Sequence, residues 1–179
     1  MDERFEIKYL INRNKNILGY YQIIGGVLGY LIFIWVLAQI GTITGLMLLI
    51  LLLVLILYAF SIYCGYSILK DKKYGFDLSS LNFFLQIFII AIQGVKYEYT
   101  SGFSLAAGLD IENNFNFQFK AMISGFNFEI KHNVDNFIIM INIVPFIAFY
   151  FINKTEKLIE RDKAIEEIIN KNYLNCNDK

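Results

Sequence analysis

The sequence predicts a membrane protein: an all-α bundle of four transmembrane helices, with a small antiparallel β-meander inserted between helices 3 and 4 and a cytoplasmic C-terminal helix. Three observations support this fold class. Apolar residues make up 56% of the 179 residues and the mean hydropathy is +0.48, which is typical of membrane proteins. Charged residues are absent from 16–69, 78–95 and 136–153. Phenylalanine alternates with polar or charged residues over 115–120 and again over 126–129, which is a strand pattern.

The charge-free stretches set the expected spans. A hydrocarbon core of about 30 Å takes about 20 helical residues, so the first stretch is long enough for two helices. We expect these at about 17–40 and 46–68, joined by a short glycine-flanked turn. The other two stretches predict one helix each, at about 78–95 and 136–153.

The distribution of basic residues predicts the orientation. Thirteen of the sixteen Lys and Arg residues lie in 1–16, in the loop before residue 78, or in 154–179, and three lie in 96–135. The positive-inside rule then places both termini in the cytoplasm and 96–135 outside. We expect the bacterial inner (cytoplasmic) membrane as the location. Residues 1–16 would form a cytoplasmic amphipathic arm, and 154–179 a cytoplasmic amphipathic helix and tail.

The exported segment 96–135 predicts the β-meander. Open sheet edges are not tolerated in hydrocarbon, so these strands are expected in water, with a turn near Ser124–Gly125. Side chains on one face would form an apolar surface made of Phe115, Phe117, Phe119, Phe126, Phe128 and Ile130. A small sheet needs a cover for such a face. The cover could be the helix ends of the chain itself, a second copy, or a separate partner.

Polar and small residues inside the predicted spans form the next candidate sites. Asn82, Gln86 and Gln93 fall on one face of the third helix, and Asn142 lies in the fourth. Amides in hydrocarbon need partners, so this membrane-embedded polar face favours interhelical hydrogen bonding over the lining of a pore. Two further features concern helix packing: the small-xxx-small pair Gly25 and Gly29, and Pro145, which would kink the fourth helix.

The C-terminal segment predicts a surface for cytoplasmic association. Apolar residues recur at helical spacing, forming a stripe of Leu158, Ile165, Ile168 and Ile169. Oppositely charged residues stand at i, i+4 on the other side. Such a stripe packs against loops of the same chain or against copies of itself.

Catalytic and metal-binding patterns are missing from the sequence. The predicted spans contain no charged residue and no histidine, and the single histidine, His132, has no cysteine or second histidine near it in sequence. Cys64 and Cys176 have no metal-ligand spacing. We therefore predict a non-enzymatic protein with no cofactor and no metal. The balance of sixteen basic and sixteen acidic residues gives no reason to expect direct nucleic-acid binding.

A short chain with four spans and basic ends inside resembles the small membrane accessory proteins encoded beside RNA-guided RNA nucleases in bacterial CRISPR defence loci. The resemblance covers length and topology, and no motif matches residue by residue. It implies a role in modulating antiviral interference at the membrane, with a defence-system protein as partner.

Two functions follow as predictions. The first is a non-enzymatic, self-associating integral membrane protein that alters membrane permeability or supports a membrane complex, as an accessory or effector in antiviral defence. Its partners would be membrane lipids and further copies of the chain. The alternative is a membrane-anchored sensor or assembly subunit whose exported sheet binds a partner.

Overall fold

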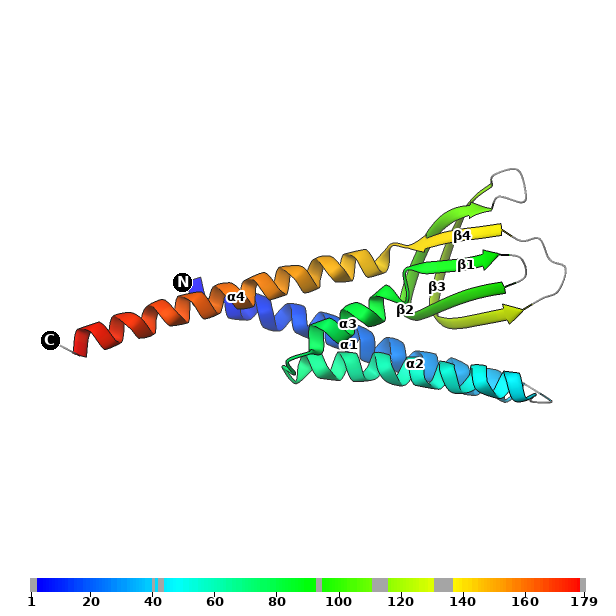
Figure 1. Cartoon of the computed structure of the whole chain (residues 1–179), viewed down its shortest axis with the longest axis horizontal. Helices are drawn as coiled ribbons and strands as arrows, with labels where there is room; N and C mark the ends of the chain where they lie inside the picture. The colour runs from blue at the N-terminus through cyan, green and yellow to red at the C-terminus, as the bar shows by residue number, and fades with distance from the viewer. Residues whose placement is uncertain are drawn as a thin grey trace.

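The computed structural model of the chain describes residues 3–39, 41, 44–92, 95–110, 116–130 and 137–177, and for 129, 130 and 172–177 it describes the backbone alone. Two long helices are followed by a short helix, four strands and a final long helix (Figure 1). In order, these are α1 (Glu3–Leu37), α2 (Gly45–Leu69), α3 (Gly75–Phe84), β1 (Phe88–Ile92), β2 (Val95–Asp110), β3 (Asn116–Ile130), β4 (Phe137–Asn142) and α4 (Val144–Asn177).

Helices α1 and α2 form an antiparallel hairpin. Glycines allow their backbones to approach closely: a Cβ atom added at Gly65 would lie 2.4 Å from the carbonyl oxygen of Gly19. Thr44 is the N-cap residue of α2. Its hydroxyl accepts a hydrogen bond from the Met47 backbone N–H at 3.4 Å and so satisfies one unpaired donor of the first turn. The segment 3–16, expected as a separate arm, is the first part of α1.

The predicted bundle of four transmembrane helices is wrong. Among the described residues, α1 and α2 are the two helices long and apolar enough to cross a membrane. The third predicted span is divided between α3 and β1, and the fourth between β4 and α4. The rest of the described chain forms the helices α3 and α4 and a four-stranded antiparallel sheet.

The error has a physical cause. The strand halves of both segments, FIIAI and FIIMIN, are rich in isoleucine, whose branched Cβ favours strands over helices. Hydropathy alone does not separate a short buried strand from a helix. Pro145 is the second residue of α4 rather than its middle, and its missing N–H costs nothing in a first turn.

The sheet has the strand order β1-β4-β2-β3, with an additional pairing of β1 with β2. It is not the predicted meander, because β4 inserts between β1 and the second half of β2. The predicted turn at Ser124–Gly125 is also absent, since β3 continues through it. Ser124 instead has a φ of 33° and Gly102 a φ of +98°, beside a break in register between Thr100 and Phe103. Long strands β2 and β3 bend here.

The sheet lies beside the hairpin rather than beyond its tip (Figure 1). A cluster of buried side chains joins the two, with Phe33, Val54 and Tyr58 from the hairpin packed around Tyr99 of β2. A second cluster, built around Phe83 and Ile152, fixes α3 and the start of α4 against the base of the hairpin. The rest of α4 and the start of α1 extend together in the opposite direction (Figure 1).

Candidate functional site

A buried amide network joins the hairpin to the sheet. Asn82 Nδ2 donates to Gln22 Oε1 at 3.1 Å and to Ser61 Oγ at 3.2 Å. The Asn82 Oδ1 atom accepts from the Tyr99 hydroxyl at 3.2 Å. All four residues are fully buried, so α1, α2, α3 and β2 meet at one side chain of α3.

Gln86 satisfies backbone groups where α3 ends. Its Nε2 atom donates to the Asn82 carbonyl oxygen at 3.1 Å, and its Oε1 atom accepts from the Ser101 backbone N–H at 3.0 Å. The last carbonyls of a helix lack helical partners, and Ser101 lies in the bend of β2. The Gln86 side-chain amide therefore hydrogen-bonds backbone groups at both the end of α3 and the bend of β2.

Asn142 plays the corresponding role where β4 ends. Its Nδ2 atom donates to the Gln86 carbonyl oxygen at 3.2 Å. Its Oδ1 atom accepts from the backbone N–H groups of Leu105 and Val144, each at 3.2 Å. The change from strand to helix is thus hydrogen-bonded through one buried side chain.

The structure therefore brings together three members of the predicted polar face, Asn82, Gln86 and Asn142. The fourth, Gln93, lies outside the described residues. The partners of the three amides belong to helices and strands of the same chain. Sequence reasoning missed Gln22 and Ser61, because isolated polar residues in long apolar runs carry no periodic signal.

The two predicted packing glycines have different contacts. A Cβ atom at Gly25 would lie 2.4 Å from the backbone nitrogen of Gly102, and Gly25 therefore faces β2 rather than another helix. A Cβ atom at Gly29 would lie 2.1 Å from the ring of Tyr58 in α2. Ser124 reinforces the first contact, because its hydroxyl donates to the Gly25 carbonyl oxygen at 2.9 Å.

A buried carboxylate lies inside the bent sheet. The Glu98 side chain is 2% exposed, and its oxygens lie 2.5 Å from Lys120 Nζ and 3.9 Å from Lys96 Nζ. The three residues come from β2 and β3 on the two sides of the bend. Burial of a charge requires such pairing. The ion pair was not predicted, because Glu98 and Lys120 are 22 residues apart in sequence.

The opposite side of the sheet carries an apolar surface, here called the outer sheet face. Residues paired directly across the strands share this face, as in the row Phe88, Ile141, Ala107 and Phe119. Phe119 is 79% exposed and Phe117 60% exposed. The exposed members of the outer sheet face are Phe88, Phe103, Leu105, Leu109, Phe117, Phe119, Ile123, Ile139 and Ile141.

The predicted exported face is divided. Phe117 and Phe119 lie on the outer sheet face, whereas Phe126 packs against the hairpin cluster with its ring centroid 6.5 Å from that of Tyr97. Phe128 is paired with Tyr97. Phe115 lies outside the described residues, as does the side chain of Ile130.

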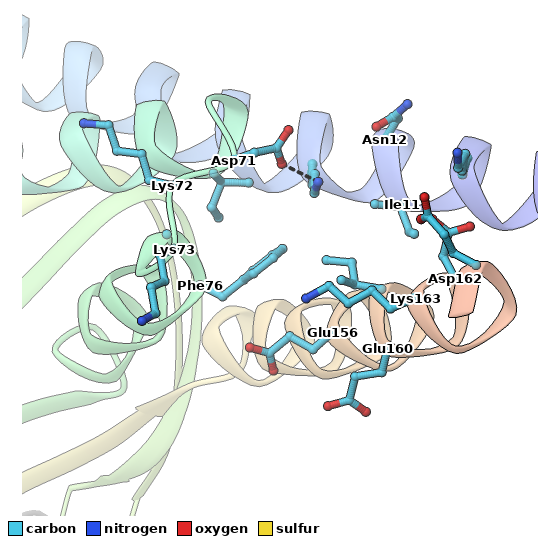
Figure 2. Close-up of a pocket in the computed structure, with 16 residues that line it drawn as sticks. Ile11, Asn12, Asp71, Lys72, Lys73, Phe76, Glu156, Glu160, Asp162 and Lys163 are labelled. Atoms are coloured by element: carbon cyan, nitrogen blue, oxygen red, sulfur yellow. Dashed lines mark hydrogen bonds and ion pairs between the residues drawn. The ribbon is translucent and has the colours of Figure 1, made fainter. Parts of the chain in front are cut away.

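At the other end of the molecule, α1, the α2–α3 loop and α4 enclose a cleft of about 850 Å³ (Figure 2). Five lysines and five acidic residues line it. Lys15 and Asp71 form an ion pair across it. Burial raises the pKa of Glu156 above its usual value, and the nearby carboxylates of Asp77 and Glu160 raise it further.

Ion pairs hold α4 against the start of α1 beside this cleft. Arg4 lies 3.0 Å from Asp162 and 2.8 Å from Glu166, and Arg161 pairs with Glu3. In the predicted cytoplasmic stripe, Leu158, Ile165 and Ile169 are half-buried. Ile168 is exposed.

The described residues contain no group of three or more His, Cys, Asp or Glu side chains placed to hold a metal ion. What the described arrangement offers is a set of apolar surfaces and a cleft of mixed charge. No protein-family model, curated protein or solved structure matches this chain.

Proposed function

We propose that the chain is a non-enzymatic, self-associating integral membrane protein that supports a membrane complex, with the α1–α2 hairpin as its anchor. One observation carries the proposal. The β2–β3 part of the outer sheet face, formed by Phe103, Leu105, Leu109, Phe117, Phe119 and Ile123, is exposed beside an edge of β3 that pairs with no described strand.

An apolar patch beside an unpaired strand edge is unfavourable both in water and in lipid. Water disfavours a large apolar patch, and hydrocarbon leaves the N–H and C=O groups of an open strand edge without partners. A second copy of the chain satisfies both requirements, because two β3 edges can pair antiparallel across a two-fold axis. The fifteen residues of β3 give this edge ample length for such pairing.

The orientation with both termini cytoplasmic is part of the proposal. Its support is that three basic segments lie at one end of the molecule. The α2–α3 loop is tied to α1 by the Lys15–Asp71 ion pair, and α1 is tied to α4 through Arg4 and Asp162. Positive charge gathered at one end of a hairpin marks the cytoplasmic side.

The biological setting in antiviral defence follows only from the resemblance of length and topology, and the described residues do not form the four helical spans of that topology. In that setting the protein would act as an accessory to a defence complex at the membrane. The identity of the neighbouring genes tests this setting directly.

A second candidate is a membrane-anchored sensor or assembly subunit that binds a partner. The cleft of about 850 Å³ favours it, because five lysines and five acidic residues at the end of α1 and α4 suit a charged peptide segment. Here the cytoplasmic cleft, rather than the sheet, would be the binding surface.

The mass of the detergent-extracted protein tests self-association. Phe119→Asp places a charge in the centre of the proposed interface and should convert an oligomer into a monomer. Phe5→Asp is the matched control, because Phe5 is also exposed but lies on the first turn of α1. A wild-type protein that is monomeric in mild detergent, and that does not cross-link in membranes through a cysteine at Phe119, would refute the proposal.

Orientation has its own test, with single cysteines in a background lacking Cys64 and Cys176. A cysteine at Gly41, in the turn of the hairpin, should react with an impermeant thiol reagent applied to intact cells, and one at Lys72 should not. The reverse pattern would show the inverted orientation.

A further inference from the structure

Two segments of the chain change secondary structure halfway along an apolar stretch. Residues 75–92 run from α3 into β1, and residues 137–152 run from β4 into the first part of α4. Neither segment contains a charged residue apart from Asp77, which lies in the first turn of α3. Both lack the length of helix that a span normally has.

Each segment is nevertheless long enough to cross a bilayer. The ten residues of α3 and the five of β1 extend together about 30 Å, at about 1.5 Å per helical residue and about 3.3 Å per strand residue. The six residues of β4 and the first two and a half turns of α4 also extend about 30 Å by the same rises. The hydrocarbon core has about this thickness.

Both segments lie alongside the hairpin. The Cys64 thiol of α2 donates to the Leu78 carbonyl oxygen of α3 at 3.3 Å. The second segment reaches the hairpin through its helical half, because Ala148 and Ile152 of α4 pack in one buried cluster with Leu18 of α1 and Ile68 of α2. The C-terminal end of β1 and the N-terminal end of β4 point the same way as the C-terminal end of α1 (Figure 1). A bilayer crossed by the hairpin therefore also contains these segments.

Non-helical backbone survives at this depth only if its polar groups have protein partners. β1 is paired with β4 along its whole length and with β2 at Ile90–Ile92, and β4 is paired with β1 and β2. At the two changes of secondary structure, Gln86 and Asn142 supply the missing hydrogen bonds. Asn142 N–H also donates to the Ile87 carbonyl oxygen at 2.8 Å, which joins the two junctions directly.

The outward side chains of both segments are suited to lipid. Leu81, Phe84 and Phe88 are exposed along the first segment, and Ile141, Ile143 and Phe146 along the second. Lys73 and Lys154 flank the segments on the side of the cleft, as basic residues do at a membrane surface. On the inner side of the sheet, Glu98, Ser104 and Asp110 are buried.

We infer that 75–92 and 137–152 cross the bilayer beside the hairpin as composite segments, half helix and half strand, with their outward side chains in contact with lipid acyl chains. This inference rests on the proposed membrane anchor. The two segments are not the transmembrane helices that the sequence predicted at 78–95 and 136–153. It assigns the β1–β4 part of the outer sheet face to lipid, and leaves the β2–β3 part, with its open edge, to a second copy.

Site-directed spin labelling in lipid vesicles tests the inference. A nitroxide is attached to a cysteine at Ile141 in a background lacking Cys64 and Cys176, and its accessibility to oxygen and to a water-soluble nickel chelate is measured. Leu52→Cys, on the exposed face of α2, is the reference for lipid. Lys72→Cys, in the α2–α3 loop, is the reference for water. The label at Ile141 should match the one at Leu52.

A label at Ile141 that matches Lys72, while Leu52 remains in lipid, would overturn the crossing and leave the hairpin anchor intact. A water-accessible label at Leu52 would instead refute the anchor itself. A monomeric wild type would refute self-association without affecting this comparison. If the label at Ile141 perturbs the fold, Phe146→Trp in a Trp35→Phe background replaces it. Brominated lipids should then quench its fluorescence, and a lack of quenching would equally overturn the inference.

Discussion

The side-chain amide of Asn142 donates to the backbone carbonyl of Gln86 at 3.2 Å, and this bond joins the two places where helix and strand meet. Gln86 follows α3 and precedes β1, and Asn142 ends β4 just before α4. Both residues are almost completely buried. Both side chains therefore contribute to the stability of the fold and are not available to bind a partner at the surface.

Asn142→Leu should destabilise the folded protein. The change removes one donor and one acceptor, which leaves the Gln86 carbonyl and the N–H groups of Leu105 and Val144 without that side-chain partner. An unsatisfied buried polar group costs roughly 1–3 kcal/mol, and the loss should show as a lower midpoint of thermal unfolding in detergent. Asn153→Leu, at an exposed position of α4, is the control. Equal midpoints for the two variants would contradict this role for Asn142.

The sequence predicted the α1–α2 hairpin and antiparallel strands within 96–135, where β2 and β3 lie, but not β1, β4 or the strand order. Helices α1 and α2 follow from one charge-free stretch long enough for two spans and from the glycine-flanked turn between them. The stretches 78–95 and 136–153 were equally free of charge, and hydropathy gave no sign that each changes from one secondary structure to another. The isoleucine-rich halves FIIAI and FIIMIN carried that information, because β-branched residues favour strands.

The polar residues of the site could likewise be predicted only in part. Asn82, Gln86 and Asn142 could be identified as amides in need of partners, because such groups are costly in an apolar setting. Their partners could not be identified, since Gln22 and Ser61 lie in other helices and the Glu98–Lys120 pair depends on a bend in β2 and β3. Long-range pairing of this kind follows from topology and not from local pattern.

Gly25→Val should weaken the docking of the sheet on the hairpin. A Cβ atom at this position would lie 2.4 Å from the nitrogen of Gly102, and backbone cannot move aside as a side chain can. Overpacking of this kind typically costs about 1–3 kcal/mol. Faster hydrogen exchange in β2 near Ser101, with a lower unfolding midpoint, should report the change.

The matched control for Gly25 is Gly45→Val, because a Cβ atom at Gly45 meets no other atom within 4 Å. Gly45 begins α2, so the control also introduces a branched residue into a helix. If both variants exchange alike, close contact between Gly25 and Gly102 does not hold the sheet in place.

Lys120→Met should destabilise the bent sheet, because the Glu98 carboxylate would lose its partner at 2.5 Å and keep Lys96 at 3.9 Å. Loss of one partner of a buried ion pair costs roughly 3–5 kcal/mol, and the cost here should fall below that range because the Lys120 side chain is 38% exposed. Glu98→Gln combined with Lys120→Met should recover part of the loss, since no buried charge then lacks its partner. Additive effects in this double-mutant cycle, measured by unfolding, would show that the two residues do not interact.

Glu156→Gln should stabilise the protein at neutral pH and have no such effect in acid. Burial, together with Asp77 and Glu160, raises the pKa of Glu156 in the folded state above its ordinary value of 4.5. Between the two pKa values the folded state binds more protons than the unfolded state, so stability falls as the pH rises through this window. Below the unfolded-state pKa the glutamate is protonated in both states, and the penalty disappears.

The measurement is the difference in unfolding midpoint between Glu156→Gln and the wild type at about pH 4 and about pH 8. The variant should be the more stable at the higher pH, and the two proteins should agree more closely at the lower one. Glu167→Gln, at an exposed position of the same helix, controls for the loss of one negative charge from α4. A larger gain in acid than at neutral pH, or the same gain from Glu167→Gln, would show that Glu156 is not held near Asp77 and Glu160 as the cleft places it.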